Sequence, residues 1–417
     1  MKKSIAHVNY LSPERYESLV NYPKLKHFGH IVIRDSRLRK PHHTPNKNVP
    51  LIKCDFSSNQ SVAHALRDIK ESVVALSATG ENNLRYYKQL IPHLPYINTP
   101  TESSIEWSTN KVMMRQKLRR YNKRIAPRFR VVTDTSEETI RKIALHVGFP
   151  LVIKPAGLAA SILVSICFYE EELTKQLNRT IKQIKQIYKK HGIREEPQIL
   201  VEQFMEGEMF SIDSYVDSFG TTYHCPIVHV KTGRQIGFDD FFGYQRTTPV
   251  KLNVLSRDSA KQTTDDAIYA LNLRSTTVHT ELMRTEDGWK IIELSPRIGG
   301  FRHQMYELGF NMNHSANDIL IRLNKKPVLP KRRQQYVAVL QLFARREGKI
   351  LKIEGLQSIT KLKSFRTIEK NLFKGDMARF AKHGGKSVLN VILANSERPQ
   401  LLADIRRLEL LLNIKTQ

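Results

Sequence analysis

The stretch IIELSPRIGG (291–300) decides how the fold of this chain is interpreted. Two isoleucines lead to Glu293, and the polar and turn residues that follow are Ser295, Pro296, Arg297, Gly299 and Gly300. A carboxylate and a guanidinium therefore lie four residues apart at the end of an apolar strand. The preceding segment, 276–290, predicts a second strand and a turn at Glu286-Asp287-Gly288, so that the two strands form an antiparallel hairpin.

Side chains alternate along a strand, so residues two apart share a face. On this basis Glu281 and Glu293 lie side by side, Ile291 shares the face of Glu293, and Ile292 points to the core. Two carboxylates that close repel each other unless a cation lies between them. Mg²⁺ is a hard cation that takes oxygen ligands, and Arg297 could hold a developing anion through two hydrogen bonds. The alternative is an exposed hairpin with solvated glutamates, which the apolar residues before Glu293 disfavour.

Two lysines and one further strand extend this hypothesis. Lys154 follows the apolar run LVI, where a lysine reaches into a cleft, and the small-residue loop AGLAAS (156–161) could cover phosphates. Lys111 lies on a basic helix on which most lysines should be solvated. The segment 201–211, VEQFMEGEMFS, could present backbone groups to a base edge, or it could be an ordinary hairpin that turns at Gly207.

Composition bounds the class of protein. The 417 residues suggest two to four domains. No apolar run approaches 18 residues, the start lacks a secretory h-region, and the three cysteines are scattered, so we expect a cytoplasmic protein without a membrane span. The 67 Lys and Arg exceed the 40 Asp and Glu by 27. Such an excess suits polyanionic partners or a generally basic, solvated surface.

The order of elements predicts an α/β (α+β) protein. Strands at 31–35 and 73–78, with a helix at 61–70 between them, indicate an α/β region over 1–105, without a G-x-G-x-x-G fingerprint. Helices are expected at 108–123, 136–148 and 170–191. Strand-like segments and a final helix indicate a small α+β domain over 330–417.

Taken together, four stretches resemble the ATP-grasp superfamily, and within it the carboxylate–amine ligases related to D-alanine–D-alanine ligase and the L-amino acid (dipeptide) ligases. The stretches are NKVMMRQKL, FPLVIKPAGLAAS, ILVEQFMEGEMFS and VHTEL followed by IIELSPRIGG. They occur in the family's order over about residues 105–320. The resemblance implies a preceding α/β domain (1–105), an ATP-grasp core (106–325, divided into 111–200 and 201–325) and a C-terminal domain (330–417).

The resemblance also implies roles for single residues. ATP phosphates would be held by Lys111 and Lys154 under a loop that contains Ser161, and adenine by Glu202 and the backbone of Phe204 and Met205. Mg²⁺, or Mn²⁺ in its place, would be bound by Glu281, Glu293 and Ser295, where the family often has Asn in place of the serine. Met209 occupies the position of the family's ribose-binding glutamate, so Glu208 is the candidate for that contact. Arg297 would hold the acyl phosphate or a substrate carboxylate.

The function implied is an ATP-dependent, ADP-forming ligase that joins a carboxylic acid, an amino acid by preference, to an amine. The alternatives are another ATP-grasp reaction, namely carboxylation or phosphorylation, and a basic nucleic-acid-binding protein that has lost catalysis. Tyr121 is the one aromatic residue of the basic helix, which disfavours stacking on nucleic acid. A homodimer is compatible with the resemblance.

The segment 237–249, which is rich in aromatic and charged residues, is a candidate for substrate recognition. Asp239 and Asp240 could bind an amino group and Arg246 a carboxylate, or the segment could be a surface lid. His303 could face the acceptor or be a packed structural histidine.

Overall fold

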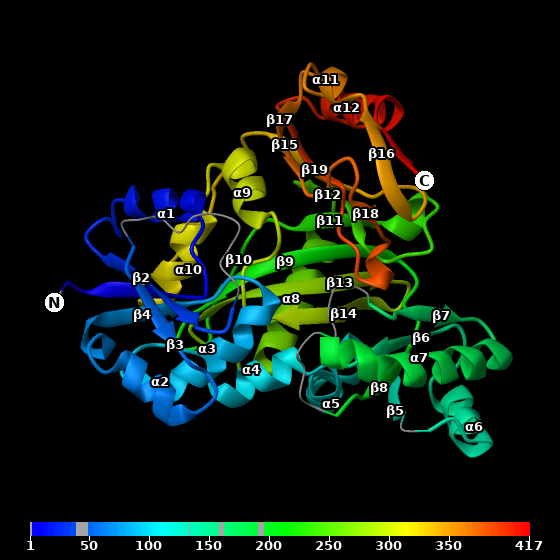
Figure 1. Cartoon of the computed structure of the whole chain (residues 1–417), viewed down its shortest axis with the longest axis horizontal. Helices are drawn as coiled ribbons and strands as arrows, with labels where there is room; N and C mark the ends of the chain where they lie inside the picture. The colour runs from blue at the N-terminus through cyan, green and yellow to red at the C-terminus, as the bar shows by residue number, and fades with distance from the viewer. Residues whose placement is uncertain (1, 39–48, 133, 158–161, 191–195) are drawn as a thin grey trace.

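The computed structural model describes residues 2–38, 49–132, 134–157, 162–190 and 196–417, and Ser161 of the predicted phosphate loop lies outside these ranges. A long mixed sheet crosses the middle of the molecule (Figure 1). An N-terminal α/β region lies at one end, and a small sheet with its helices lies below. The predicted α/β class is confirmed.

The N-terminal region is built on a parallel sheet with the strand order β3-β2-β1-β4. Its strands are β1 (Ser4–Val8), β2 (Gly29–Asp35), β3 (Leu51–Cys54) and β4 (Val73–Ser77), and its helices are α1 (Pro13–Val20), α2 (Asn59–Leu66), α3 (Leu84–Leu90) and α4 (Glu102–Thr109). Side-chain oxygens of Ser12, Ser58 and Thr101 cap α1, α2 and α4. The predicted strands near 31–35 and 73–78 are confirmed, and α2 is shorter than the helix expected at 61–70.

The small sheet is antiparallel, with the order β5-β8-β6-β7. Its elements, with the basic helix before them, are α5 (Lys111–Tyr121), β5 (Phe129–Val132), α6 (Glu137–His146), β6 (Leu151–Pro155), β7 (Ser165–Cys167), α7 (Glu170–Lys190) and β8 (Ile199–Gln203). Ser136 caps α6, as its sequence predicts. Helices α6 and α7 pack their apolar faces on this sheet.

The long sheet has the order β14-β13-β9-β11-β12-β15-β19-β17, and β10 adds to β9. Its first six strands in the chain are β9 (Glu208–Val216), β10 (Thr222–His224), β11 (Val228–Thr232), β12 (Gly243–Thr248), β13 (Thr276–Thr285) and β14 (Gly288–Ser295). The helices that pack on it are α8 (Val254–Ala270), α9 (Arg302–Phe310) and α10 (His314–Arg322). Helices α5 and α8 cover one face, and α9 and α10 lie on the other.

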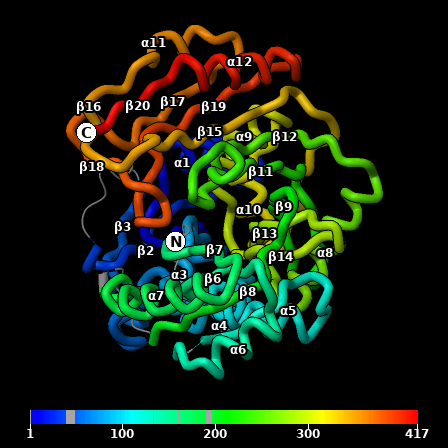
Figure 2. Tube along the Cα trace, turned by 90° about the vertical axis from the view of Figure 1, so that its right-hand side faces the viewer, coloured from blue at the N-terminus to red at the C-terminus, as the bar shows by residue number. Residues whose placement is uncertain are grey.

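The C-terminal segment completes the same sheet. Strands β15 (Tyr336–Leu342), β17 (Phe365–Lys370) and β19 (Leu389–Asn395) continue from β12, because β15 pairs with β12. The remaining elements are β16 (Gly348–Glu354), α11 (Leu356–Ile359), β18 (Met377–Ala378), α12 (Arg398–Leu411) and β20 (Asn413–Thr416). Figure 2 shows α11 and α12 at the top of the view, far from α6 at the bottom. The predicted domain boundaries remain a prediction.

The predicted hairpin of β13 and β14 is confirmed, with one correction. Glu281 lies opposite Glu293, but the register then shifts, so that Leu282 pairs with Ile291. This β-bulge adds one residue to β14 and reverses the alternation before Glu293. Ile291 is therefore in the core and Ile292 is only partly buried. The prediction for these two isoleucines was wrong, because strict alternation does not anticipate an extra residue.

In the described part of the chain, no helix has both the length and the apolar character needed to cross a membrane.

Candidate functional site

Two carboxylates on neighbouring strands form the centre of the site. Glu281 on β13 and Glu293 on the edge strand β14 are direct cross-strand partners, so both side chains project from one face of the sheet. Each side chain is about one third exposed, at 32% and 33%. Lys111, the first residue of α5, places its Nζ 3.2 Å from Glu293 Oε1. Asn110 caps α5 by accepting from the N–H groups of Val112 and Met113.

A second charged cluster lies on the small sheet. Lys154 on β6 and Glu202 on β8 lie diagonally across paired strands, and Lys154 Nζ is 2.6 Å from Glu202 Oε2. Arg115 of α5 donates from Nε to Glu202 Oε1 at 2.7 Å. It also donates from Nη2 to the carbonyl of Ile292, the bulged residue of β14, at 2.6 Å. Arg115 therefore links the small sheet to the strand that carries Glu293.

Burial shifts the proton affinities of this cluster. It lowers the pKa of Lys154 to about 8, although the charge of Glu202 opposes the shift. Burial alone would raise the pKa of Glu202, but the charges of Arg115 and Lys154 hold that pKa below its ordinary value. A lysine whose charge is this costly gains from an additional anion, which is what a nucleotide phosphate supplies.

Arg297 is held by the N-terminal region. Its Nε lies 2.8 Å from Oε2 of Glu81, and the same oxygen accepts from Ser295 Oγ at 2.7 Å. Burial works against the charge of Arg297, but Glu81 outweighs it and raises the pKa of the guanidinium. Ser295 is buried and its hydroxyl proton is directed to Glu81. Its role as a third metal ligand remains a prediction.

Asp213 of β9 orders the residues around Glu281. It is fully buried and accepts from His279 Nδ1 at 2.6 Å, from His314 Nε2 at 2.8 Å and from the Gly299 N–H at 2.9 Å. Nε2 of His279 in turn lies 3.6 Å from Glu281 Oε1. Burial would raise the pKa of Asp213, but the two histidines hold it well below its ordinary value. Despite burial, Asp213 also raises the pKa of His279, which favours an imidazolium beside Glu281.

The residues predicted to contact adenine, Phe204 and Met205, and the residue predicted to contact ribose, Glu208, have different surroundings in the structure. The N–H of Phe204 donates to the Pro150 carbonyl at 3.0 Å, whereas none of the hydrogen bonds among the described residues uses the N–H of Met205. Glu208 pairs with Arg284 and lies on the same face of β9 as Phe210, opposite the face that carries Ser211 and Glu281. The structure therefore does not bring Glu208 to the cluster around Glu281.

The segment 237–249 contributes one residue to the site. Asp239 Oδ2 lies 2.7 Å from Lys382 Nζ, and Asp240 is buried and accepts from the Lys382 N–H at 3.0 Å, so both aspartates anchor the C-terminal segment. Asp239 lines a pocket of ≈ 290 Å³ between α7 and the C-terminal segment, and Asp240 lies beside that pocket. Arg246, in contrast, lies on the face of Glu281. His303 is partly buried on α9, contacts Ser315 and Glu307, and has its pKa lowered by burial to about 4.

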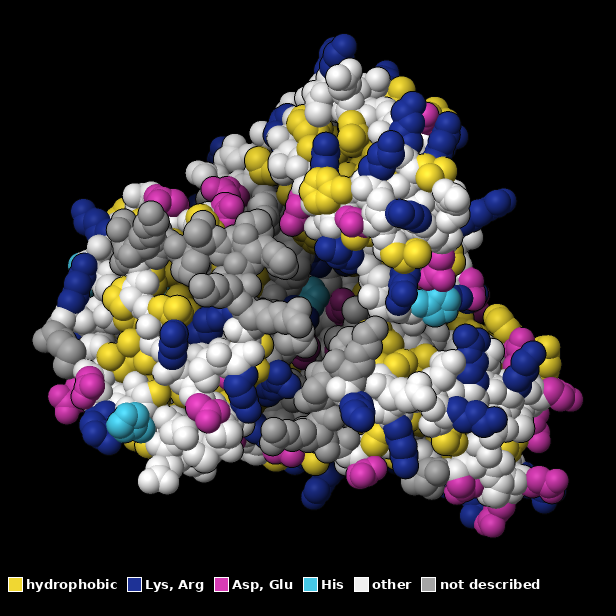
Figure 3. Space-filling view, in the orientation of Figure 1, with side chains coloured by type: hydrophobic (Ala, Val, Ile, Leu, Met, Phe, Trp, Pro, Cys, Tyr) yellow, Lys and Arg dark blue, Asp and Glu magenta, His cyan; other side chains and the backbone are white. Residues whose placement is uncertain are grey.

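The donor set fits Mg²⁺. Among the residues that the structure describes, no group of three or more His, Cys, Asp or Glu side chains could hold a metal ion. Two partly exposed carboxylates side by side are the protein share that Mg²⁺ usually takes when substrate phosphates supply the rest. Figure 3 shows the molecule hollowed at its centre, where basic, acidic and histidine side chains are visible below the rim.

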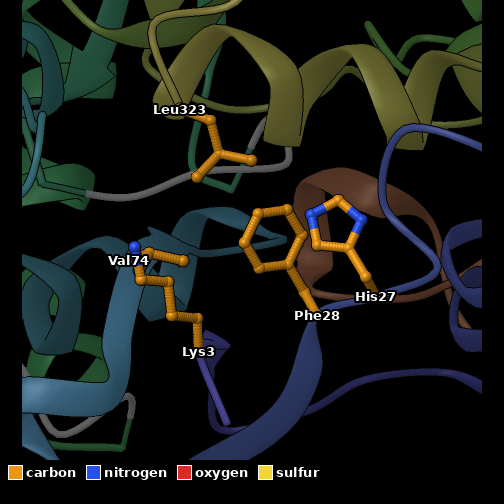
Figure 4. A pocket seen from close by; sticks show the side chains of 5 residues that line it. All are labelled: Lys3, His27, Phe28, Val74 and Leu323. Carbon is orange, nitrogen blue, oxygen red and sulfur yellow. The ribbon is translucent and has the colours of Figure 1, made fainter.

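A second hollow lies elsewhere. A pocket of ≈ 550 Å³ opens beside the N-terminal sheet, where the ring of Phe28 and the side chain of Leu323 approach each other (Figure 4). Its lining side chains are Lys3, His27, Phe28, Val74 and Leu323. They include no carboxylate and none of the predicted site residues, so this hollow is separate from the candidate site.

Four residues of the site were missed from the sequence. Glu81 and Asp213 act through partners more than 60 positions away. Asp213 carried a usable signal, since it is a charged residue within the apolar strand that follows Gly207. Arg115 also carried one, because it lies three residues from both Val112 and Leu118 and thus on the buried stripe of α5. His314 offered no such signal.

Comparisons with known proteins show what the chain is similar to. Residues 147–304 match the family model described as an ATP-grasp domain. The chain is 27% identical over 261 residues to the uncharacterized protein y4rH of Sinorhizobium fredii, covering 62% of this chain and 50% of that protein. It is 27% identical over 215 residues to the alanine–anticapsin ligase of Bacillus amyloliquefaciens, covering 47% of this chain and 44% of that protein. This chain thus spans about half the length of the curated relatives that it matches.

The fold extends beyond the matched domain. The structure of the L-amino acid ligase from Bacillus licheniformis superposes with a TM-score of 0.76 at 17% identity, covering 100% of this chain and 99% of that one. The match at residues 147–304 contains Lys154, Glu202, Glu281, Glu293 and Arg297, whereas Lys111 lies outside it. Residues 147–304 thus match an ATP-grasp domain, and the relatives that the chain resembles support the carboxylate–amine ligase branch of that superfamily.

Proposed function

We propose that this protein is an ATP-dependent, ADP-forming ligase that joins the carboxylate of an acid, an amino acid by preference, to an amine. The observation that carries the proposal is the cross-strand pair Glu281–Glu293, with Lys111 on one side and Arg297 beyond it. Such a pair attracts a metal cation, and the cationic side chains around it favour the binding of anions. A metal-bound nucleotide and a carboxylate substrate supply both the cation and the anions.

Lys111 and Lys154 would hold the ATP phosphates, and the backbone at Phe204 and Met205 would receive the adenine edge. The carbonyl of Phe204 and the N–H of Met205 suit that role, because the N–H of Phe204 already donates to Pro150. Glu202 would position Lys154 through their 2.6 Å contact and lie near the base. Ser161 would belong to the covering loop.

Glu281 and Glu293, with Ser295 as a further oxygen, would hold Mg²⁺ or Mn²⁺. The metal would neutralise phosphate oxygens during transfer. The residues of the chain position the reactants and stabilise charge, which is most of what phosphoryl transfer needs from a protein. His279, held by Asp213, fixes the orientation of Glu281.

The reaction follows from the chemistry of the acid. A carboxylate is a poor acyl donor because its oxygen leaves badly. The carboxylate oxygen would attack the γ-phosphorus of ATP, ADP would leave, and an acyl phosphate would form. The amine would then attack the carbonyl carbon and lose a proton, and inorganic phosphate would leave. Arg297 would stabilise the negative charge of the acyl phosphate.

The test is Mg²⁺-dependent ADP release from ATP with pooled amino acids and small carboxylic acids, for wild type and Glu293→Gln. We expect release from wild type only when substrates are present, and a loss of about 100-fold or more in Glu293→Gln, since the charge that attracts the metal is removed. Glu354→Gln, at a partly exposed glutamate of β16 that pairs with Lys415, is the matched control and should keep wild-type activity. ADP release that is equal in wild type and Glu293→Gln would contradict the proposal.

Two further results would distinguish the proposed ligase from the two alternative functions. ADP release that requires bicarbonate or another acceptor, and no amine, would indicate a different ATP-grasp reaction. Nucleic-acid affinity that falls steeply with salt and is unchanged in Glu293→Gln would indicate a basic nucleic-acid-binding protein that has lost catalysis. The cytoplasmic location and a homodimer remain predictions.

A further inference from the structure

Arg246 lies on the active-site face of the long sheet, at a distance from the carboxylate pair. Successive pairings place Glu281 opposite Ser211, and Ser211 opposite Val228. In the next row Met209 lies opposite Val230, and Val230 opposite Arg246. Arg246 is therefore three strands from Glu281, or about 14 Å between backbones at about 4.8 Å per strand.

The guanidinium of Arg246 has only neutral partners. Its Nη1 donates to the carbonyl of Gly243 at 2.9 Å and to Oε1 of Gln341 at 2.5 Å. In the described ranges no Asp or Glu forms an ion pair with Arg246, and these two bonds leave Nε and Nη2 for another acceptor. A partly buried guanidinium that forms no ion pair is costly even with the charge of Glu281 on the same face, so a ligand anion would stabilise this arrangement.

The surroundings orient the side chain and add positive charge. Phe301 lies under the guanidinium, with 5.7 Å between the Cζ atom and the ring centroid. Burial and the charge of nearby Arg302 lower the pKa of Arg246 to about 10, although the charge of Glu281 acts in the opposite direction. Arg302 itself is occupied, because it donates to Ser211 Oγ at 2.6 Å and to the Gly300 carbonyl at 3.0 Å. One guanidinium therefore remains at this end of the face, which matches one carboxylate better than a phosphate.

We propose that Arg246 is a specificity-determining residue that binds a second carboxylate, so that one substrate is an acidic amino acid. Arg297 serves the reacting end, near Glu281 and Glu293, and Arg246 serves the remote end of the same molecule. Met209, which is partly buried, lies between the two ends, and Val230 beside it is buried in the apolar core. The inference rests on the proposed ligase function for the reacting end only.

The test compares acidic amino acids with their amide counterparts, glutamate with glutamine and aspartate with asparagine. Kinetics of ADP release are measured for wild type, Arg246→Gln, Arg246→Lys and the exposed control Arg366→Gln. We expect the KM of wild type to be about 10-fold or more lower for the acidic member of at least one pair. Arg246→Gln should remove that preference and leave the KM of the amide unchanged, whereas Arg246→Lys should keep part of the preference and Arg366→Gln all of it.

A calorimetric titration separates this proposal from the proposed function. Wild type and Arg246→Gln, each with Mg²⁺ and a non-hydrolysable ATP analogue, are titrated with glutamate, glutamine and the dicarboxylate glutarate. If the acidic compounds bind to wild type but not to Arg246→Gln, and the kinetic assay with ATP shows no ADP release, the carboxylate subsite is supported and the ligase is not. ADP release with neutral amino acids, together with no preference for acidic compounds, would overturn the subsite and leave the ligase standing.

Discussion

At the scale of single residues, the burial of Lys154 makes the site sensitive to pH. The pKa of Lys154 is lowered from 10.5 to about 8 by burial, so its charge is lost at a mildly alkaline pH. In the folded protein the charged form is disfavoured relative to the unfolded chain. The free energy of unfolding contributed by this group should therefore rise as the pH increases from about 8 to 10.5.

Nucleotide affinity should change in the opposite direction. Phosphates select the charged lysine, so above pH 8 binding must take up a proton, and affinity should fall by about 10-fold between pH 7 and pH 9. Titrating wild type with Mg²⁺ and a non-hydrolysable ATP analogue at both values checks this.

Lys154→Arg provides the comparison, because arginine stays charged throughout this range. It should show a much smaller loss of affinity between the two pH values. The exposed Lys142→Arg, on α6 of the same region, should behave like wild type. An equal pH dependence in Lys154→Arg and wild type would contradict the role given to Lys154.

The sequence predicted some of these residues and missed others for physical reasons. Glu281 and Glu293 were predictable as a pair, because strand alternation and a short turn specify local geometry. Glu81 was not, because its contact with Arg297 depends on how the N-terminal region docks on the long sheet. The roles assigned to the site residues remain predictions, which the experiments above test.

At the scale of elements, β9 is held in place by a charged residue in its middle. Asp213 joins β9 to β13 through His279, to α10 through His314, and to the glycine loop after β14 through Gly299. A Cβ at Gly299 would come within 2.4 Å of His279 Nδ1, so the loop approaches this histidine closely. Four segments therefore share one buried carboxylate.

Removing this charge should destabilise the protein. We expect Asp213→Asn to lower the free energy of unfolding by about 3–5 kcal/mol, because two histidines and one N–H lose a fully buried anionic acceptor. Urea unfolding measures the change. Asp217→Asn, in the exposed turn that follows the same strand, should stay within about 0.5 kcal/mol of wild type. A similar small effect at both positions would show that Asp213 is not the structural centre described.

Elements with strong local signals matched the sequence interpretation. The Ser136 cap and the early glutamates predicted α6, and apolar β-branched runs predicted β2 and β4. The bulge at Ile292 was not predictable, because an extra isoleucine in an apolar strand looks like an ordinary strand residue. Its carbonyl accepts from Arg115, so the irregularity connects the two sheets.

At the scale of the whole molecule, the C-terminal segment belongs to the sheet that carries the site. β15 pairs with β12 along four residues, and β19 and β17 follow outward. Among the described residues, apolar side chains of β12, such as Tyr244, pack in one core with those of β15 and β19. The sequence suggested a small separate domain here, since strand pairing over such distances leaves no local signal.

Truncation after residue 330 tests whether the predicted domain boundary is also a folding boundary. Loss of β15, β17 and β19 would leave β12 as an open edge and would expose Tyr244 and Phe242, so we expect aggregation and loss of the cooperative thermal transition. Size-exclusion chromatography and near-ultraviolet circular dichroism measure both. Removal of β20 alone, residues 413–417, should be tolerated. A truncated chain that unfolds cooperatively at the wild-type temperature would instead support an independent C-terminal domain.

The place of β12 has a consequence for how the protein is made on the ribosome. During synthesis β12 emerges well before β15, so the nascent chain carries half of its central sheet with one unpaired edge. The partly charged strand GYQRTT, with Arg246 in it, is then the surface most exposed to other nascent chains. Until β15 emerges, Arg246, which we assign to substrate recognition, would also help to keep this unpaired edge from pairing with a strand of another nascent chain.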